Sequence, residues 1–331
     1  MGAGIHFSEV GQGRLNMRAL ASYIMRGPVQ ATLVTAAFAL TSLIPILGLL
    51  SILSGAAVAL VTLRQGAKQG ITVVLGASLV AGIFMYFVFG SMLPGLLFAV
   101  LMWLPLWGLS LVLRTTSSWS ILLDAVATLG ILVVAAFYIA LGEPAQLWQQ
   151  VLAQMLELMS SQGGMAEMDA IQQQIPSLAE WMTGLLAGAM VIGLIASMLL
   201  ARWWQALLYN PGGFRQEFHA LRQSKIASLT VLLILVVSKL GLGKISTMAG
   251  DIMIIAVMVY SVVGLALVHA LVARTVKHVG FLVALYVLLF IIPPHVMLAL
   301  ASAAFADSWM DFRGRLALSK KSDNNDRHDN Q

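Results

Sequence analysis

Long runs of apolar residues, separated by short polar connections, cover most of the chain. An α-helix needs about 20 consecutive apolar residues to cross the hydrocarbon core of a bilayer. The pattern therefore predicts an all-α, polytopic transmembrane helix bundle with about eight or nine membrane spans. The apolar runs cover residues 28–44, 46–63, 70–89, 94–113, 119–141, 181–202, 226–241 and 249–272, and a ninth apolar region covers 279–306.

The ninth apolar region is interrupted by the double proline of "FIIPPHVML", Pro293 and Pro294. Proline lacks a backbone donor, so we expect the helical hydrogen-bond ladder to break here. The halves 279–292 and 295–306 would each be about 18–21 Å long, too short for a hydrocarbon core of about 30 Å. The region is therefore either one kinked helix that crosses once, or a re-entrant hairpin that returns to the side where it began.

The distribution of Lys and Arg predicts the orientation, because connections on the cytoplasmic side are enriched in these residues. If the N-terminus is cytoplasmic, nearly every basic connection lies inside, and the outer side keeps only Lys239 and Lys244. A single crossing by 279–306 would also place the tail residues outside, so the bias favours the hairpin and a cytoplasmic C-terminus. The basic residues of the inner connections are Arg14, Arg18, Arg26, Arg64, Lys68, Arg114, Arg202, Arg215, Arg222, Lys225, Arg274 and Lys277, and those of the tail are Arg313, Arg315, Lys320, Lys321 and Arg327.

These patterns divide the chain into three parts. We expect a cytoplasmic N-terminal segment at 1–27, a transmembrane bundle at 28–306 and a charged, partly disordered tail at 307–331. Met17 is an alternative start, because the stretch before it is weakly patterned. The first apolar run leads directly into the second, so the N-terminus does not resemble a cleaved signal peptide.

The longest connection, 143–180, predicts an external amphipathic segment. In "QLWQQVLAQMLELM", apolar residues recur at helical spacing opposite glutamines and Glu157. "SQGG" at 161–164 is expected to end this helix, and "AEMDAIQQQI" to form a second short one. Ser177 and Glu180 have the spacing of a capping box that would open the sixth span. The apolar positions are Trp148, Val151, Leu152, Met155, Leu156 and Met159.

The connection at 203–225 is predicted to be a cytoplasmic loop that follows the membrane surface. Trp203, Trp204 and Tyr209 are residue types that favour the headgroup region. "NPGG" at 210–213 indicates a turn. After the turn, Phe214, Phe218 and Leu221 form an interfacial stripe, in which the two phenylalanines are candidates for docking a partner.

Composition supports the membrane assignment and narrows the chemistry. The chain is 60% hydrophobic and 10% charged, against about 25% charged residues in soluble domains. Absence of cysteine excludes disulfides, thiolate nucleophiles and cysteine-ligated metals. The sequence pI of about 9.6 reflects basic residues that orient helices against lipid, so we expect no nucleic-acid partner.

Ionisable residues within apolar helices are costly, so Asp124 and Asp251 are functional candidates. Asp124 lies early in the fifth span, where it could pair with a basic group, bind a cation or simply reach the interface. Asp251 lies near the outer end of the eighth span, where we expect Lys239 or Lys244 to neutralise it. Such an ion pair would fix two helices.

His269 and His295 are the histidine candidates. A lone histidine in a membrane helix more often bonds a neighbouring helix than it binds a metal or carries a proton. His, Asp and Glu do not recur at zinc-ligand spacing, so we expect no metal site. Phosphate-binding, dinucleotide and hydrolase motifs are absent from the sequence, so we expect no cofactor and no enzyme activity.

The cluster "FADSWMDFRGR" at 305–315 supplies the remaining candidates, Asp307, Arg313 and Trp309. If the cluster is helical, Asp307 and Asp311 share a face and Arg315 follows Asp311 at i+4. One interpretation is an ion-paired helix end, anchored in the interface by Trp309 and Phe312. The other is a ligand, gating or docking site.

Small residues recur at helical spacing in three apolar runs and predict close helix packing rather than a particular function. They are Ala31, Thr35 and Ala39, then Ser51, Gly55 and Ala59, then Gly184 and Gly188.

Five stretches of the chain carry a resemblance to a known family. They are "MRALASYIMRG" (17–27), "LRQGAKQG" (63–70), "LLYNPGGFRQEFHALR" (207–222), "GLALVH" (264–269) and "DSWMDFR" (307–313). Together they resemble the YybS-like family of bacterial predicted membrane proteins, named for a domain of unknown function. The resemblance covers about 17–316 and implies a multi-pass protein of the bacterial inner membrane.

That family is distantly similar to the S components of energy-coupling-factor vitamin transporters, which dock a coupling subunit through an Ala-x-x-x-Ala pattern. Here the pattern is Ala31-x-x-x-Thr35-x-x-x-Ala39.

Two hypotheses about function follow. In the first, the bundle binds or transports a small molecule like a vitamin-uptake S component, with a wet cavity covered by 143–180 and polar side chains beneath that cover. In the second, the bundle is a dry membrane scaffold that docks a membrane or cytoplasmic protein through 203–225 and the tail. The lipid bilayer is a partner in both.

Overall fold

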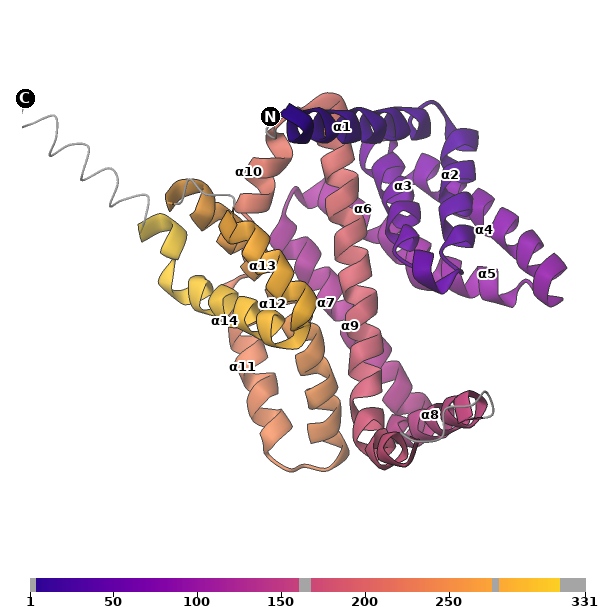
Figure 1. The fold of residues 1–331 in the computed structure, drawn as a ribbon, viewed down its shortest axis with the longest axis vertical. Coiled ribbons are helices and arrows are strands. Elements are labelled where there is room, and N and C mark those ends of the chain that lie inside the picture. Colours follow the sequence, from indigo (N-terminus) through magenta and orange to yellow (C-terminus); the bar gives the residue numbers. More distant parts are fainter. Residues whose placement is uncertain (1–3, 161–167, 276–279, 316–331) are drawn as a thin grey trace, which may run out of the picture. The chain divides into compact units, whose positions relative to one another are not determined.

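In the computed structural model, residues 4–160, 168–275 and 280–315 are described, and the regular elements among them are all helical (Figure 1). The chain divides into two units, and α7 (Trp119–Leu141) and α9 (Met168–Tyr209) contribute to both. The first unit comprises the described residues of 1–122 and 192–218. The second comprises those of 123–191 and 219–331.

The first unit begins with α1 (Gly4–Ile24) and α2 (Pro28–Thr41). The expected reversal at Pro45 is confirmed, because a 3₁₀ turn, η1 (Pro45–Leu47), leads into α3 (Leu50–Gln65), which packs against α2. The remaining elements of this unit are α4 (Ala67–Phe89), α5 (Leu93–Phe98), the π-helical turn η2 (Ala99–Trp103), α6 (Leu104–Thr116) and α10 (Gly213–His219).

The predicted small-residue faces pack closely in the first unit. Thr35 is fully buried, and its carbonyl accepts a 2.7 Å hydrogen bond from Ser54, which in turn accepts one from Trp103 Nε1 at 3.0 Å. A Cβ atom added to Gly55 would come within 2.5 Å of Leu106 Cδ1. Small residues thus let the helix axes approach where larger ones would clash.

The second unit contains parts of α7 and α9 together with α8 (Pro144–Ser160), α11 (Lys225–Lys239), α12 (Lys244–Thr275), α13 (Gly280–Ile291) and α14 (Pro293–Met310). The amphipathic helix expected after residue 143 is confirmed as α8. Trp148, Val151 and Leu152 on its apolar face are half-buried.

The expected second short helix and the capping box at Ser177 are wrong. Described residues from 168 onward form one continuous helix, α9, with Pro176 and Ser177 in its interior. Proline removes only one hydrogen bond from the ladder, and a helix of 42 residues tolerates that loss when the surrounding bonds remain. "SQGG" at 161–164 lies outside the described residues.

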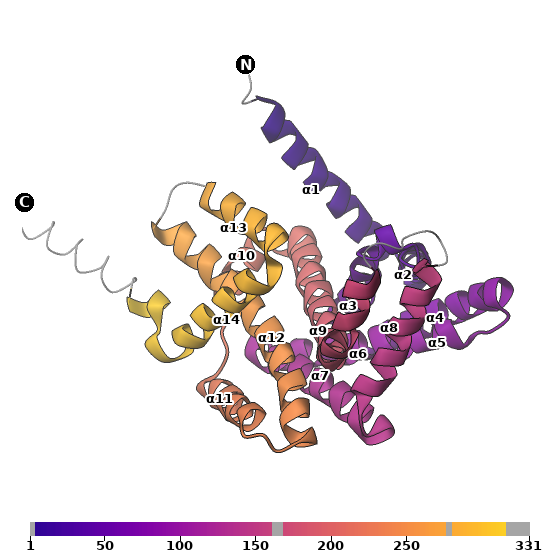
Figure 2. The same cartoon turned by 60° about the horizontal axis from the view of Figure 1, so that its bottom comes forward.

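The predicted break at the double proline is confirmed. Helix α13 ends at Ile291, and Pro293 and Pro294 form the first turn of α14, where their missing donors are not needed. Figures 1 and 2 show that α14 turns back beside α13, and α14 packs along α12. The closest approach is at Gly264, where an added Cβ would lie 2.1 Å from the Leu300 carbonyl oxygen.

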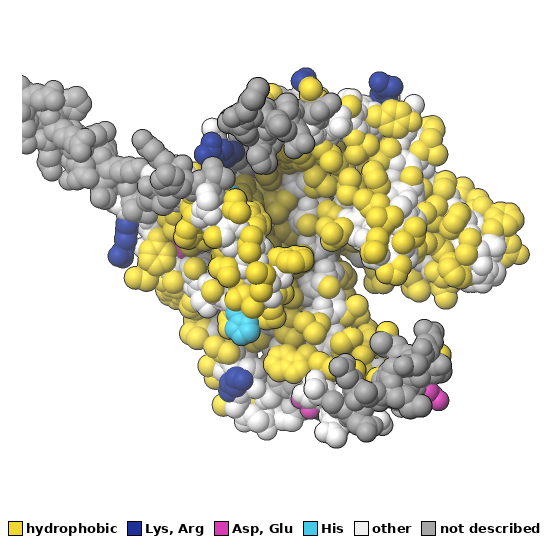
Figure 3. Space-filling model, viewed as in Figure 1, with side chains coloured by type: hydrophobic (Ala, Val, Ile, Leu, Met, Phe, Trp, Pro, Cys, Tyr) yellow, Lys and Arg dark blue, Asp and Glu magenta, His cyan; other side chains and the backbone are white. Residues whose placement is uncertain are grey.

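Among the described residues, five helical segments are long and apolar enough to cross a membrane, and α2, α3 and α13 are shorter apolar helices. Figure 3 shows hydrophobic side chains over most of the visible described surface and few charged ones. Large apolar side chains such as Phe87 and Phe290 are exposed, as expected of a surface that meets lipid. The five segments are 67–89, 93–116, 119–141, 171–209 and 244–274.

Candidate functional site

A cavity of about 270 Å³ lies in the second unit among α7, α11 and α12. Its wall is mainly aliphatic, with side chains such as Ile131, Ile255 and Val259. Its polar members are Asp124, Thr128, Gln223, Ser224, Thr230 and Tyr260. A mostly apolar pocket with a few polar groups is the usual form of a small-molecule site. Among the described residues of 143–180, none lines this cavity, so the cover expected from the sequence is not found there.

Asp124 and Gln223 meet at this cavity from distant parts of the sequence. Asp124 lies in the second turn of α7, and Gln223 directly precedes Ser224, whose hydroxyl caps α11 by accepting a hydrogen bond from Ala227 N at 3.1 Å. Gln223 Nε2 donates to Asp124 Oδ1 at 3.0 Å. The structure therefore gives Asp124 a neutral amide partner instead of the basic group considered from the sequence.

Gln223 has a second feature that matters for ligand binding. Its side chain is only 8% exposed, and its Oε1 atom is buried without a hydrogen-bond partner in the described part of the chain. A buried acceptor without a donor is unfavourable. The cavity wall therefore offers the Asp124 carboxylate, which accepts hydrogen bonds, and the unsatisfied Gln223 oxygen is buried beside it.

A second cavity, of about 300 Å³, lies between α11, α12 and α14. Val231, Ala256 and Tyr260 line both cavities. The Tyr260 hydroxyl is 3.0 Å from Ser228 Oγ, which is 2.7 Å from Ser308 Oγ, so hydroxyl groups connect α12, α11 and α14. Helix α11 thus has open space on two sides.

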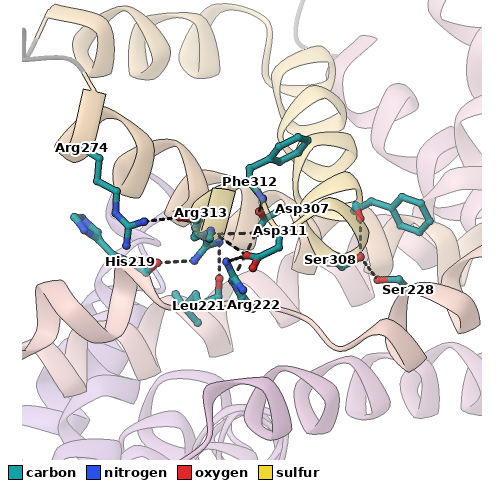
Figure 4. A network of polar contacts seen from close by, with 12 residues as sticks. His219, Leu221, Arg222, Ser228, Arg274, Asp307, Ser308, Asp311, Phe312 and Arg313 are labelled. Atoms are coloured by element: carbon teal, nitrogen blue, oxygen red, sulfur yellow. Dashed lines mark hydrogen bonds and ion pairs between the residues drawn. The ribbon is translucent and has the colours of Figure 1, made fainter. Parts of the chain in front are cut away.

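The tail residues Asp307 and Arg313 form a buried ion pair, as Figure 4 shows. Their side chains are 2% and 4% exposed, and Arg313 Nε lies 3.3 Å from Asp307 Oδ2. Arg313 also donates to two main-chain carbonyls, those of His219 and Leu221, the latter at 2.8 Å. The guanidinium fork thereby fixes the segment before α11 against the end of α14.

The helical arrangement expected for 305–315 is wrong in part. Helix α14 ends at Met310, and Asp311 adopts a left-handed conformation with φ 47°. Asp311 pairs with Arg222 instead of Arg315, and its Oδ1 also accepts from Gly314 N at 3.2 Å. The turn brings Phe312 N within 2.9 Å of Asp307 Oδ1.

Asp311 and Arg313 in this cluster both have lowered pKa values, but for different reasons. The hydrogen bond from Arg222 lowers the pKa of the exposed Asp311 carboxyl below its usual value. Burial lowers the pKa of Arg313 to about 10, although Asp307 acts in the opposite direction. Arg313 therefore remains a cation at physiological pH, and removing its carboxylate partner would leave a buried charge unpaired.

Arg274 connects the same cluster to the end of α12. Its Nη1 donates to the Arg313 carbonyl oxygen at 2.8 Å, across 39 positions of sequence. The two ends of the segment that contains α13 and α14 therefore lie together within the second unit.

Asp251 is buried, but the lysine partner expected for it is wrong. Its Oδ2 accepts from the Tyr138 hydroxyl at 2.8 Å and its Oδ1 from Gly184 N at 3.0 Å. Lys244 pairs with Glu143 at 3.1 Å. Because Gly184 has no Cβ, α9 and α12 approach closely enough for the carboxylate to reach a main-chain amide.

The two histidines differ in their surroundings. His269 on α12 has its Nε2 3.3 Å from the Tyr286 hydroxyl on α13 and its Nδ1 2.8 Å from Leu265 O, which fits the expected bonding between helices. His295 is exposed in the first turn of α14. Within the described ranges, no three His, Cys, Asp or Glu side chains are grouped closely enough to hold a metal ion.

The candidate docking residues belong to different units. In the first unit, the rings of Phe214 and Phe218 stack on α10 with centroids 5.9 Å apart. Helix α10 is fixed by Glu217, which pairs with Arg202 and accepts from Trp119 Nε1 at 3.3 Å. In the second unit, Trp309 is 48% exposed. Trp204, expected at the headgroup level, is fully buried.

Sequence reasoning missed Gln223, Arg222 and Arg274 as members of the cavity and the tail cluster. The signal that could have drawn attention to Arg222 is its place at the end of "LLYNPGGFRQEFHALR". Polar side chains in a loop are expected to contact solvent, so the sequence did not indicate that Gln223 is buried.

Comparison with known proteins places the chain in a family. Residues 32–308 match the family model described as "Predicted membrane protein (DUF2232)". The chain belongs to this family. The matched region of this DUF2232 protein contains every residue that lines the two cavities, together with Asp251, Arg274 and Asp307, and ends before Arg313. No curated protein and no solved structure shows significant similarity to it.

Proposed function

We propose that this DUF2232 protein binds a small molecule as part of a transport function. The observation that carries the proposal is the cavity of about 270 Å³ among α7, α11 and α12, where the Asp124 carboxylate lies in a mainly aliphatic wall. The resemblance of sequence stretches to a family distantly similar to vitamin-uptake S components is in line with the same class of function.

The packing around α11 supports movement of this helix. Cavities of about 270 and 300 Å³ lie on two of its sides, so it can shift without displacing a tightly packed neighbour. Its N-terminal end is held by the carbonyl contacts of Arg313 and by the Ser224 cap. A helix with open space on two sides is suited to opening and closing a binding cavity.

The proposed topology places the protein in the bacterial inner membrane, with both termini cytoplasmic and α13–α14 as a re-entrant hairpin after eight spans. With 12 and 18 residues, α13 and α14 are about 18 and 27 Å long, short for a hydrocarbon core of about 30 Å. The contact between Arg274 and Arg313 supports a hairpin, because both ends of the segment must then lie on one side.

A scaffold that docks a cytoplasmic protein is the second candidate. Trp309 is exposed beside a turn that the Asp307–Arg313 pair holds in place, and aromatic residues on a fixed support are common anchors in interfaces. Arg313 itself is buried, so its role in docking would be to support the surface formed by Trp309.

The test is gentle purification of a tagged copy at native expression level, followed by mass spectrometry of retained small molecules and proteins. A stoichiometric small molecule, lost in an Asp124→Leu variant that still folds, would support the binding function. A stoichiometric protein partner without any small molecule, lost in Trp309→Ala, would favour the scaffold. Retention of the small molecule in Asp124→Leu would contradict the assigned cavity.

A further inference from the structure

We infer that the ligand of the α7–α11–α12 cavity is a small, largely apolar molecule that carries one protonated amine, held by Asp124. This inference rests on the proposed binding function and adds the chemical class of the ligand. Three observations carry it: the charge of the site, its hydrogen-bonding inventory and its size.

Charge is the first observation. The ion pairs described in the second unit join Arg222 and Arg313 to the tail aspartates and Lys244 to Glu143. Asp124 has no Lys or Arg partner among the described residues, and its hydrogen-bonded partner is a neutral amide. A carboxylate within a membrane helix is costly without a positive partner. A cationic ligand would supply that partner, whereas an anionic ligand would be repelled.

The hydrogen-bonding inventory is the second observation. The Asp124 carboxylate accepts hydrogen bonds at the cavity, and Gln223 Nε2 satisfies only one of its oxygens, Oδ1, at 3.0 Å. A protonated amine has up to three donors and no acceptor, so it matches the carboxylate. A bare divalent cation matches less well, because Mg²⁺ and Ca²⁺ take about six or more oxygen ligands.

Size and lining are the third observation. The volume of about 270 Å³ is near the lower limit of ligand pockets, roughly 300 Å³. Ile131, Ile252, Ile255 and Val259 provide an aliphatic wall that fits a hydrocarbon or aromatic body. The site thus combines a polar end for one amine with an apolar body of limited size.

The first experiment measures binding of three probes of similar size to the full-length protein in phosphatidylcholine nanodiscs by equilibrium dialysis. The probes are 2-phenylethylamine, 2-phenylethanol and phenylacetate, and empty nanodiscs correct for partitioning into lipid. We expect the amine to bind at least about tenfold more tightly than the alcohol, because hydrogen bonds to charged groups are the stronger kind. Equal binding of amine and alcohol, or preference for the acid, would overturn the inference.

Substitutions then locate the site. Asp124→Asn keeps the size of the side chain and should weaken amine binding about tenfold or more while leaving alcohol binding nearly unchanged. Asp124→Glu keeps the charge and should retain a preference for the amine. Glu143→Gln removes an exposed carboxylate outside the cavity and is the matched control. If Asp124→Asn does not fold, the ranking of probes by the unaltered protein still decides the question.

Different experimental outcomes would overturn this inference alone or the proposed function as well. An acid or alcohol retained by the purified protein would overturn the amine class and leave small-molecule binding in place. Absence of any bound probe and of any retained molecule would overturn both.

Discussion

Arg274 Nη1 donates a 2.8 Å hydrogen bond to the main-chain carbonyl oxygen of Arg313, and this contact closes a segment of 39 positions that contains both halves of the proline-broken apolar region. Arg313 continues the connection with its own side chain, which reaches the His219 and Leu221 carbonyls before α11. The end of α12, the loop before α11 and the chain after α14 therefore form one polar cluster.

The first prediction follows from this cluster. Cysteine substitutions at Gln216 and Met310 should both react with a membrane-impermeant maleimide applied from the cytoplasmic side, because the loop and the tail share that side in the proposed topology. The chain has no native cysteine, so each substitution provides a single reporter. Glu157→Cys in α8 should react only from the outer side. Labelling of Met310→Cys from the outer side would show that the region 279–306 crosses the membrane once and does not form a hairpin.

Arg313→Ala should be strongly destabilising. The substitution leaves the Asp307 carboxylate, which is 2% exposed, without its close cation, and breaking a buried pair costs about 3–5 kcal/mol. Thermal unfolding of the detergent-solubilised protein measures the change. Replacing both partners, as in Asp307→Leu with Arg313→Met, should cost less than Arg313→Ala alone, because no buried charge remains. A loss below about 1 kcal/mol for Arg313→Ala would contradict a buried pair.

Gly264→Ala should destabilise the packing of α12 against α14 by about 1–3 kcal/mol. The added Cβ would lie 2.1 Å from the Leu300 carbonyl oxygen, and a main-chain atom cannot move aside as a flexible side chain can. Gly250→Ala is the matched control on the same helix, since its Cβ would meet nothing within 4 Å. The control should be neutral or slightly stabilising because alanine favours helix. Equal effects of the two substitutions on thermal unfolding would contradict the close approach.

The Asp311 carboxylate should stabilise the folded protein at neutral pH but not in strong acid. The hydrogen bond from Arg222 lowers the pKa of Asp311 in the folded protein, so the carboxylate stabilises the fold above its ordinary pKa of about 3.8. That contribution is lost as the pH falls through the lower, folded-state pKa. The difference in Tm between the unaltered protein and Asp311→Asn should therefore be small but measurable at pH 7 and should decrease as the pH falls below about 3.8. A Tm difference that increases on acidification would contradict a lowered pKa for Asp311 in the folded protein.

The helices could be predicted from the sequence to a large extent, because each depends on local pattern. Long apolar runs identified α4, α7 and α12, and the periodicity around Trp148 identified α8. The double proline, Pro293 and Pro294, identified the break between α13 and α14, since two successive missing donors interrupt the hydrogen-bond ladder. The capping-box spacing of Ser177 and Glu180 was misleading, because α9 continues through both residues.

The sequence by itself determined the membrane class, the helical segments and the polar residues that required partners, because apolar length, proline and charge act through the local chain. Only the tertiary structure decided which partners those residues found. Asp251 met Tyr138 and a main-chain amide at Gly184, and Asp124 met Gln223 across 99 positions. Buried polar groups bond to whatever helix packing brings within about 3 Å, and that packing depends on contacts between distant segments that no local pattern records.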